Sequence, residues 1–374
     1  MSLVDFNVAI EKLRTFAEKE IAPFAIDGDL EPSSAWVRTV WQKSETLGMP
    51  SLPLSENLGG AAYPDFCLAL FLDVLSSACP GVASVYAHHY AACLSVLHAE
   101  AEQLKGLFSG GTCLKTRHTP IFCMLFSKND SPEKLSLKEI DGHLFLSGVS
   151  SLTGNAHFAD KFCVFAKDGD MEGSMTCMVL DSRQTGFAFP YLQDISGLKL
   201  NPMAEVRCRN IPVSRKDIIG IRGRGNKILE ESLFSFHNFL SAMIMGAVRN
   251  VWKKTIDYVD DRYQFGIQTI HYQEIQKILK HMMQKLNDGT SAYIKVFEAP
   301  GGNRDVSPED TRQTRKLCKA CACDIIMDAL KIEDPATHAV AYGLEKIIRD
   351  VETLAMIDRG GRYHPLERVH RKVG

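Results

Sequence analysis

Residues 262–273 read Arg-Tyr-Gln-Phe-Gly-Ile-Gln-Thr-Ile-His-Tyr-Gln and join two long segments of helical pattern. Apolar residues recur three and four positions apart in residues 232–263 and again in residues 272–295, which is the spacing of a helix with one apolar face. The same spacing returns in residues 308–330 and 342–357. The four segments predict an antiparallel bundle of long helices at the C-terminal end of the chain.

Two regions of different texture precede this bundle. Up to about residue 107, apolar residues again follow helical spacing, interrupted by prolines and by the Gly59-Gly60 break. Between about residues 118 and 219, short apolar or aromatic runs alternate with turn residues such as Asp141-Gly142, which is typical of strands. The succession of helices, strands and helices predicts three domains, at residues 1–117, 118–219 and 220–374.

Composition excludes several classes of partner. The 374 residues carry a formal net charge of -2, which gives no electrostatic reason to expect nucleic acid. No apolar run of about 18 residues or more predicts a membrane span, and the N-terminal residues lack the pattern of a secretory signal, so we expect a cytoplasmic protein. Three of the eleven cysteines, Cys318, Cys321 and Cys323, cluster on a predicted helix. That spacing makes a poor zinc site, and we expect no metal.

Four segments together resemble the acyl-CoA dehydrogenase family. Residues 262–273 resemble its RxxFGxxxxxxQ pattern, and residues 342–350 resemble its ErxxRD helix. Residues 148–160 resemble its G-x-K-x-W-I-T-N-x-x-x-A-D segment, and residues 197–225 resemble its middle-domain strand and the Gly-rich loop that follows. The resemblance implies an N-terminal helical domain, a middle β-barrel or sandwich domain and a C-terminal four-helix bundle.

The same resemblance implies an FAD cofactor and a homodimer or homotetramer. Arg262 would reach the FAD diphosphate of the neighbouring subunit, with Phe265 and Gln273 nearby; a forked, permanently charged side chain suits a diphosphate. On the other side of the cofactor, Ser127 and Thr153 would hydrogen-bond the flavin ring, the alternative being that either only caps a strand turn. The alternative is that Arg262 caps a helix and Phe265 packs in the core.

The chain departs from the family pattern at several of these positions. The tryptophan that flanks the flavin ring is replaced by Leu152, and the Ile-Thr pair after it is replaced by Thr153-Gly154. Residues 331–337 stand in place of a Gly-Gly segment that lets backbone N–H groups approach the diphosphate. We therefore expect FAD to be bound weakly or not at all.

Two further residues are candidates for the reaction itself. The family base is a glutamate nine residues after the arginine of the Arg-Asp pair, and here that position is Asp358, whose side chain is shorter by about 1.5 Å. The resemblance implies that it removes the α-proton of an acyl-CoA thioester while a β-hydride passes to flavin N5. The alternative is that Asp358 pairs with Arg359 or caps a turn. His237 takes the place of an arginine that helps to hold the acyl-CoA, unless it is simply a polar core residue.

Three functions follow from the resemblance. The first is an FAD-dependent oxidoreductase of fatty acid metabolism that oxidises the CH–CH group of an acyl-CoA thioester and passes electrons to electron-transfer flavoprotein or a similar acceptor. The second is an enzyme similar to nitroalkane oxidase or a flavin monooxygenase. The third is a non-catalytic partner subunit that lends Arg262 to the FAD of another chain. Visible flavin absorbance in the purified protein separates the first two from the third.

Overall fold

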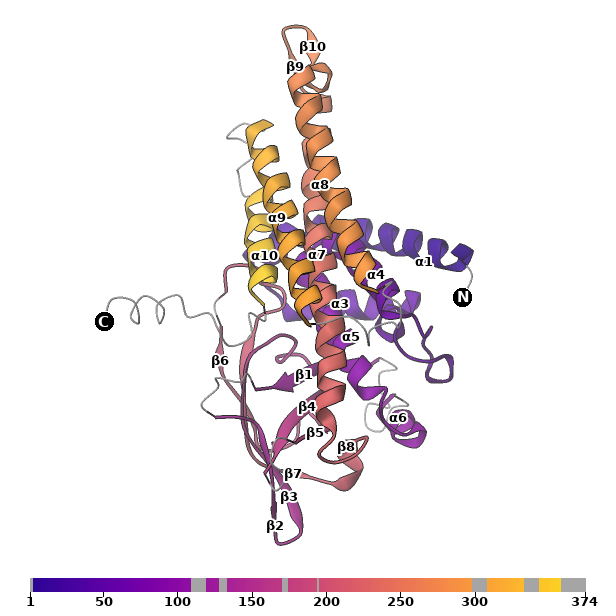
Figure 1. Cartoon of the computed structure of the whole chain (residues 1–374), viewed down its shortest axis with the longest axis vertical. Coiled ribbons are helices and arrows are strands. Elements are labelled where there is room, and N and C mark those ends of the chain that lie inside the picture. Colours follow the sequence, from indigo (N-terminus) through magenta and orange to yellow (C-terminus); the bar gives the residue numbers. More distant parts are fainter. Residues whose placement is uncertain are drawn as a thin grey trace, which may run out of the picture.

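The computed structural model describes residues 3–108, 119–127, 133–169, 174–193, 195–297, 308–332 and 343–357. The predicted fold class is confirmed, because one eight-stranded sheet lies between two helical regions along the chain and forms the lower end of the molecule in Figure 1. The division into domains at residues 117/118 and 219/220 stays a prediction.

The first region is a helical layer built around α5. Its helices are α1 (Leu3–Phe16), α2 (Ala25–Leu30), α3 (Ser34–Ser44), α4 (Asp65–Ala78), α5 (Pro80–Val96) and α6 (Ala101–Phe108). Short π or 3-10 turns lie at Ala17–Ile21, Ala22–Phe24, Glu45–Leu47, Met49–Ser51 and Glu56–Leu58. Helix α5 is almost entirely buried, as expected for a helix without charged side chains that carries apolar residues on all its faces.

The strands form one eight-stranded sheet. They are β1 (Phe122–Phe126), β2 (Ser136–Ile140), β3 (His143–Thr153), β4 (Lys161–Asp168), β5 (Met175–Asp181), β6 (Phe187–Leu192), β7 (Ala204–Val213) and β8 (Ile218–Ile219). The order is β6-β7-β3-β2-β4-β5-β8, and β1 pairs with β4. Strands β1 and β2 both run parallel to β4, β1 along its first half and β2 along its end. Ser127, directly after β1, donates a hydrogen bond to the carbonyl of Val149 in β3.

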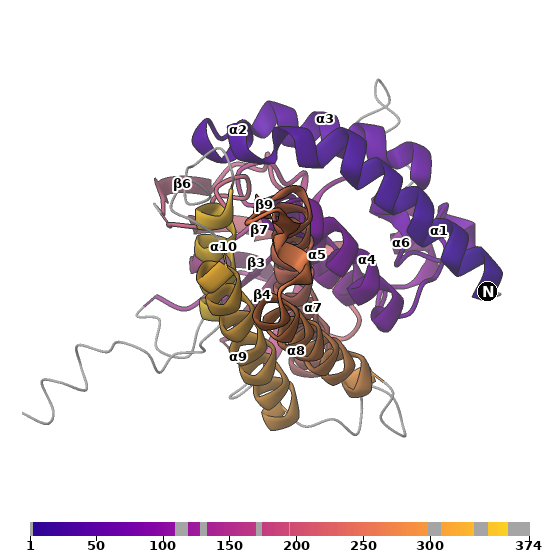
Figure 2. The ribbon, with the colours of Figure 1, turned by 90° about the horizontal axis from the view of Figure 1, so that it is seen from above.

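The bundle follows as α7 (Gly225–Asp261), α8 (Gln273–Phe297), α9 (Pro308–Ile332) and α10 (Leu344–Met356). A 3-10 turn at Arg215–Asp217 precedes it. Between α7 and α8 lie a small hairpin, β9 (Tyr263–Gln264) with β10 (Ile267–Gln268), and a 3-10 turn at Thr269–His271. Helix α7 contacts α4, α5, α8, α9 and α10. Seen from above, α1, α2 and α3 lie on one side of α5, and α8 and α9 lie on the other (Figure 2).

Helices α4 and α7 approach each other so closely that α7 needs a glycine. A Cβ on Gly246 would lie 2.1 Å from the carbonyl oxygen of Asp73. Beside this contact Arg249 donates two hydrogen bonds to the Asp73 carboxylate, and the Tyr293 hydroxyl donates a third at 2.7 Å. The buried carboxylate is thus satisfied from two helices, which fixes α8 against the α4–α7 pair.

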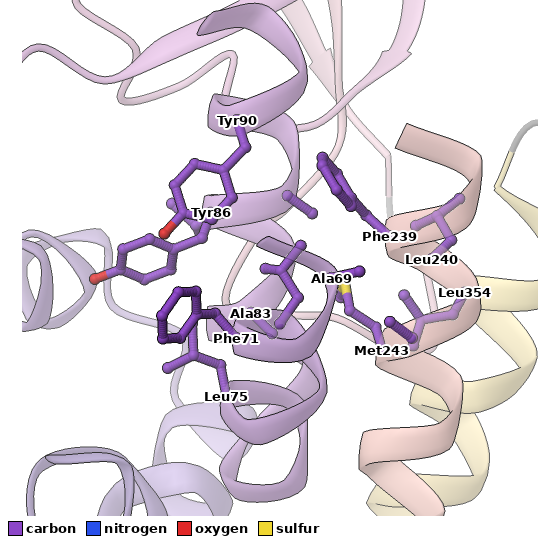
Figure 3. Close-up of a cluster of buried hydrophobic side chains, with 14 of the residues drawn as sticks. Ala69, Phe71, Leu75, Ala83, Tyr86, Tyr90, Phe239, Leu240, Met243 and Leu354 are labelled. Atoms are coloured by element: carbon purple, nitrogen blue, oxygen red, sulfur yellow. The ribbon is translucent and has the colours of Figure 1, made fainter. Parts of the chain in front are cut away.

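The apolar core joins the first helical region to the bundle. Figure 3 shows Tyr86 and Tyr90 of α5 in the same cluster as Phe239 and Leu240 of α7 and Leu354 of α10. Burying each such large side chain contributes about 1.5–3 kcal/mol. The position of α10 along α7 is therefore set by core packing.

Two absences hold for the described ranges. Within them, no helix is long and apolar enough to cross a membrane. Over the same residues, no group of three or more His, Cys, Asp or Glu side chains is arranged to hold a metal ion. Cys318 and Cys321 of α9 are buried free thiols.

Candidate functional site

Helix α10 is fixed to the sheet region by its Arg-Asp pair. Asp350 is fully buried and accepts hydrogen bonds from Lys346 Nζ at 2.5 Å and from the Leu198 N–H at 2.6 Å. Arg349 donates to Asp29 at 2.6 Å and to the carbonyl of Ser196. These contacts tie α10 to α2 and to the chain between β6 and β7, so the Arg-Asp motif orients the helix.

A glycine permits this contact. A Cβ on Gly197 would lie 2.4 Å from the carbonyl oxygen of Arg349. The candidate base Asp358 follows directly after the last described residues of this segment, and it lies outside the described residues. Its predicted role stays a prediction.

The second part of the site is where the end of β3 meets α5 and α7. We call Thr153, Gly154, His88 and Phe236 the ring junction, because Thr153 and Gly154 stand where the resembled family contacts the flavin ring. The His88 and Phe236 rings lie with centroids 4.7 Å apart in an edge-to-face arrangement. A Cβ on Gly154 would lie 2.6 Å from His88 Nε2. The β3 end and α5 are therefore in direct contact.

His88 is neutral and its tautomer follows from its hydrogen bond. Nδ1 lies 2.7 Å from the carbonyl oxygen of Ser84, so we assign the proton to Nδ1, which donates, and the lone pair to Nε2. Burial lowers the pKa of His88 to about 4, because the charged form is disfavoured away from water. His88 was not among the predicted site residues. The sequence signal is the His88-His89 pair inside a mainly apolar helix.

The neighbouring His89 has a structural role. Its Nδ1 accepts the N–H of Phe122 at 3.1 Å, and its Nε2 lies 2.8 Å from the carbonyl oxygen of Pro50. Both ring nitrogens are therefore used in joining α5 to β1 and to the chain before α4.

The two hydroxyls predicted to contact a flavin ring are used inside the sheet. Ser127 Oγ donates to the carbonyl of Val149 at 2.7 Å and accepts the N–H of Leu135 at 2.7 Å. Thr153, only 6% exposed, lies 3.0 Å from Ser150 Oγ. Ser150 donates its one hydrogen to the carbonyl of Phe126, so Thr153 is the donor to Ser150. Each hydroxyl thus donates its hydrogen to an acceptor of the same chain.

The third part lies at the far end of the bundle from the sheet (Figure 1). We call residues 262–273 the hairpin tip. Arg262 ends α7 with its guanidinium 5.3 Å from the Tyr258 ring centroid. Phe265 is 97% exposed at φ 49, and Gln273 is exposed at the start of α8. The alternative in which Phe265 packs in the core is wrong, because the hairpin turn presents it to solvent.

The structure thus groups the predicted site residues into two separate places. Arg262, Phe265 and Gln273 lie together at the hairpin tip, while Thr153 lies at the ring junction. His237 is half-buried on α7 beside Phe236, their ring centroids 6.3 Å apart, so it borders the ring junction. A cofactor that touched both places would have to receive the hairpin tip from another subunit.

Comparison with known proteins agrees with this architecture. Residues 7–107 match the acyl-CoA dehydrogenase N-terminal domain, and residues 223–361 match the acyl-CoA dehydrogenase C-terminal domain. The chain therefore belongs to the acyl-CoA dehydrogenase family, whose activity is that of FAD-dependent oxidoreductases.

Relatives match along the whole length. The 3-(aryl)acrylate reductase of Clostridium sporogenes is 24% identical over 369 residues, which cover 96% of each chain. The structure of butyryl-CoA dehydrogenase from Megasphaera elsdenii superposes with a TM-score of 0.83 at 17% identity, covering 100% of both chains. A glutaryl-CoA dehydrogenase from Mycobacterium smegmatis in complex with FADH2 gives a TM-score of 0.80 at 16% identity, covering 96% of this chain and 91% of that one. The two structures share the fold of this chain.

The described residues fit FAD at one end only. At the hairpin tip, a partly exposed guanidinium beside exposed side chains suits a diphosphate brought by another subunit. At the ring junction, the hydroxyl hydrogen of Thr153 is already donated and the His88 ring lies over Gly154, and the hydroxyl hydrogen of Ser127 is donated elsewhere on β3. In this arrangement the ring junction does not fit a flavin ring.

Proposed function

We propose that this chain is an FAD-dependent oxidoreductase that acts on the CH–CH group of an acyl-CoA thioester and passes electrons to electron-transfer flavoprotein or a similar acceptor. The observation that carries the proposal is the fixed course of α10 toward the ring junction. Leu354 lies in the cluster of Leu240 (Figure 3), and Phe236 of the ring junction is one turn before Leu240 on α7. Helix α10 ends at Met356, two residues after Leu354.

Asp358 is the proposed base of this reaction. It comes four residues after Leu354 in the sequence, beyond the end of α10. Its carboxylate would remove the α-proton of the thioester, and a buried position would raise its pKa toward the range in which a general base works at neutral pH. FAD, when bound, supplies the electron acceptor for the β-hydride.

The exposed hairpin tip supports a homodimer or homotetramer. Tyr263, Phe265 and Ile267 are 66%, 97% and 50% exposed on one short hairpin. Three neighbouring exposed apolar side chains favour a surface that another subunit covers. In that assembly Arg262 would reach the diphosphate of the neighbouring subunit's FAD.

A second candidate is the non-catalytic partner subunit. It is favoured by the hydrogen bonds of Ser127 and Thr153, which leave neither hydroxyl hydrogen for a flavin ring of this chain. In that case the chain would contribute only Arg262 to the FAD of a different subunit.

One experiment separates the two candidates. The purified protein is loaded with FAD at high concentration and screened with acyl-CoA thioesters and an artificial electron acceptor. An oxidoreductase shows turnover that depends on both FAD and one class of thioester. Absence of turnover with every thioester, in protein that demonstrably carries FAD, would exclude the enzyme and favour the partner subunit.

A further inference from the structure

The imidazole of His88 covers the end of β3 at Gly154. A Cβ built on Gly154 would lie 2.6 Å from Nε2, 2.7 Å from Cε1 and 2.9 Å from Cδ2 of His88. Three atoms of one ring within this distance mean that the imidazole occupies the space into which any side chain at position 154 would project. The space in front of the β3 end is thus filled by the chain itself.

Glycine at this position is required by His88 and not by the backbone. Gly154 is absent from the residues with positive φ, whereas its neighbours Leu152 and Asn155 have φ of 53 and 65. An ordinary backbone conformation accepts any residue. The pair of His88 and Gly154 is therefore a steric match between α5 and the sheet.

A chain of hydrogen bonds holds His88 in this place. Its Nδ1–H donates to the carbonyl of Ser84, and the Ser84 hydroxyl accepts a hydrogen bond from Asn201 Nδ2 at 2.8 Å. Asn201 Oδ1 in turn accepts the N–H of Asn155, the residue after Gly154, at 2.8 Å. The imidazole and the backbone that it covers are thus linked through one buried amide. Phe236 packs against the other side of the ring.

We propose that His88 blocks the position of the flavin ring, so that the ring binds only after His88 turns away from Gly154 and FAD is held mainly through its diphosphate end. The inference rests on the proposed function, because only an FAD-dependent chain has a ring position to block. It names the residue that limits cofactor affinity. The family resemblance places the ring beside positions 152–154, and the geometry places His88 over Gly154.

Flavin-free protein titrated with FAD tests this directly. His88→Ala removes the ring and should bind FAD at least tenfold more tightly than the parent, a difference of about 1.4 kcal/mol. His143→Ala, which removes an exposed histidine at the start of β3, is the matched control and should bind FAD like the parent. FAD affinity that is equal or weaker in His88→Ala overturns the proposal.

Two outcomes separate this inference from the proposed function. Tighter FAD binding by His88→Ala without oxidation of any acyl-CoA supports the block and contradicts the oxidoreductase. If neither the parent protein nor His88→Ala binds FAD, the proposal that His88 blocks the flavin ring is contradicted, because removing the imidazole then gives no binding site for the ring.

Thermal unfolding checks the geometry even if the alanine variant folds poorly. Gly154→Thr alone should lower the melting temperature, because the new side chain meets the imidazole. Gly154→Thr combined with His88→Ala should recover most of that loss. Equal losses in the two backgrounds would show that His88 does not occupy the space in front of Gly154.

Discussion

The hairpin tip and the ring junction belong to the same resembled cofactor site, yet they are built in opposite ways. At the hairpin tip, Phe265 is 97% exposed and its neighbours Tyr263 and Ile267 also face solvent. At the ring junction, Thr153 is 6% exposed and His88 is 9% exposed. One half of the site is open to another molecule, and the other half is closed by the chain's own side chains.

The difference shows which half depends on a partner. The hydrogen bonds of Ser127, Thr153 and His88 all end within the chain, so the ring junction is stable without a ligand. The exposed Phe265 ring adds little to the stability of the hairpin tip, since an exposed apolar side chain contributes little to folding. The exposed Phe265 ring is therefore proposed to contact another subunit. The following experiments test the proposed base, the two halves of the site and the sheet hydroxyl that follows β1.

Removing the proposed base should have the largest effect. Asp358→Asn keeps the size of the side chain and removes its basicity, so turnover should fall by about 10²–10⁴ while FAD binding is retained. The control is Asp141→Asn, in an exposed turn with positive φ that asparagine accepts. Unchanged acyl-CoA oxidation by Asp358→Asn would show that another group is the base.

The next largest effect is expected at the hairpin tip. Arg262→Ala should weaken FAD binding by about tenfold or more, because a charge-assisted hydrogen bond to a diphosphate contributes on the order of 1.5–3 kcal/mol. Equilibrium titration with FAD measures this change in affinity. Lys277→Ala, which removes an exposed cation from α8, is the control for net charge. Equal affinity in the Arg262 variant and the parent would contradict the role assigned to the hairpin tip.

Acid should destabilise the ring junction through His88. Burial lowers the pKa of His88 to about 4, so between its ordinary pKa and this value the unfolded chain binds a proton that the folded chain does not. Stability therefore falls as the pH falls, by on the order of 2 kcal/mol for this group between about pH 7 and pH 5. Urea unfolding of His88→Ala should show a loss of unfolding free energy over the same pH range that is smaller by that amount. An identical loss in both proteins would contradict the buried, neutral histidine.

A smaller effect is expected from the sheet hydroxyl. Ser127→Ala leaves the N–H of Leu135 and the carbonyl of Val149 without their partner, which should lower the free energy of unfolding by about 1–2 kcal/mol. FAD affinity should not change. The hydroxyl of Ser147 bonds the exposed Asn210, so Ser147→Ala should lower the free energy of unfolding by less. Loss of FAD affinity in Ser127→Ala, with stability retained, would instead assign Ser127 to the flavin ring.

The helices could be predicted from the sequence better than the strands could. Apolar spacing predicts helices at 272–295 and 308–330, and α8 and α9 run at Gln273–Phe297 and Pro308–Ile332. Strand β2 has no such signal, because only Leu137 of its five residues is buried. Strand β6 lies at the edge of the sheet, where one side has no neighbouring strand. Strand β2 therefore lacks an apolar run, and the apolar run of β6 is interrupted by Pro190, which sheets accept at an edge.

The ring junction could not be predicted for a different reason. His88 and Gly154 are 66 residues apart in the chain, and neither local sequence predicts that they are in contact. Likewise, the sequence shows that Ser127 and Thr153 carry hydroxyls. Only the folded sheet shows that Ser127 donates its hydroxyl hydrogen to Val149 and Thr153 to Ser150. The hairpin tip, in contrast, is one continuous segment, so its residues could be named together from the motif.

The claim that FAD is held through the hairpin tip and not through the ring junction is tested most directly by comparing FAD with ADP. Calorimetric titration of the flavin-free protein gives the Kd of each ligand. If the ring junction is closed, the flavin ring adds little, and the two values should agree within about tenfold, or about 1.4 kcal/mol. FAD binding that is tighter than ADP binding by more than this would mean that the ring junction holds the flavin ring, and would contradict the account.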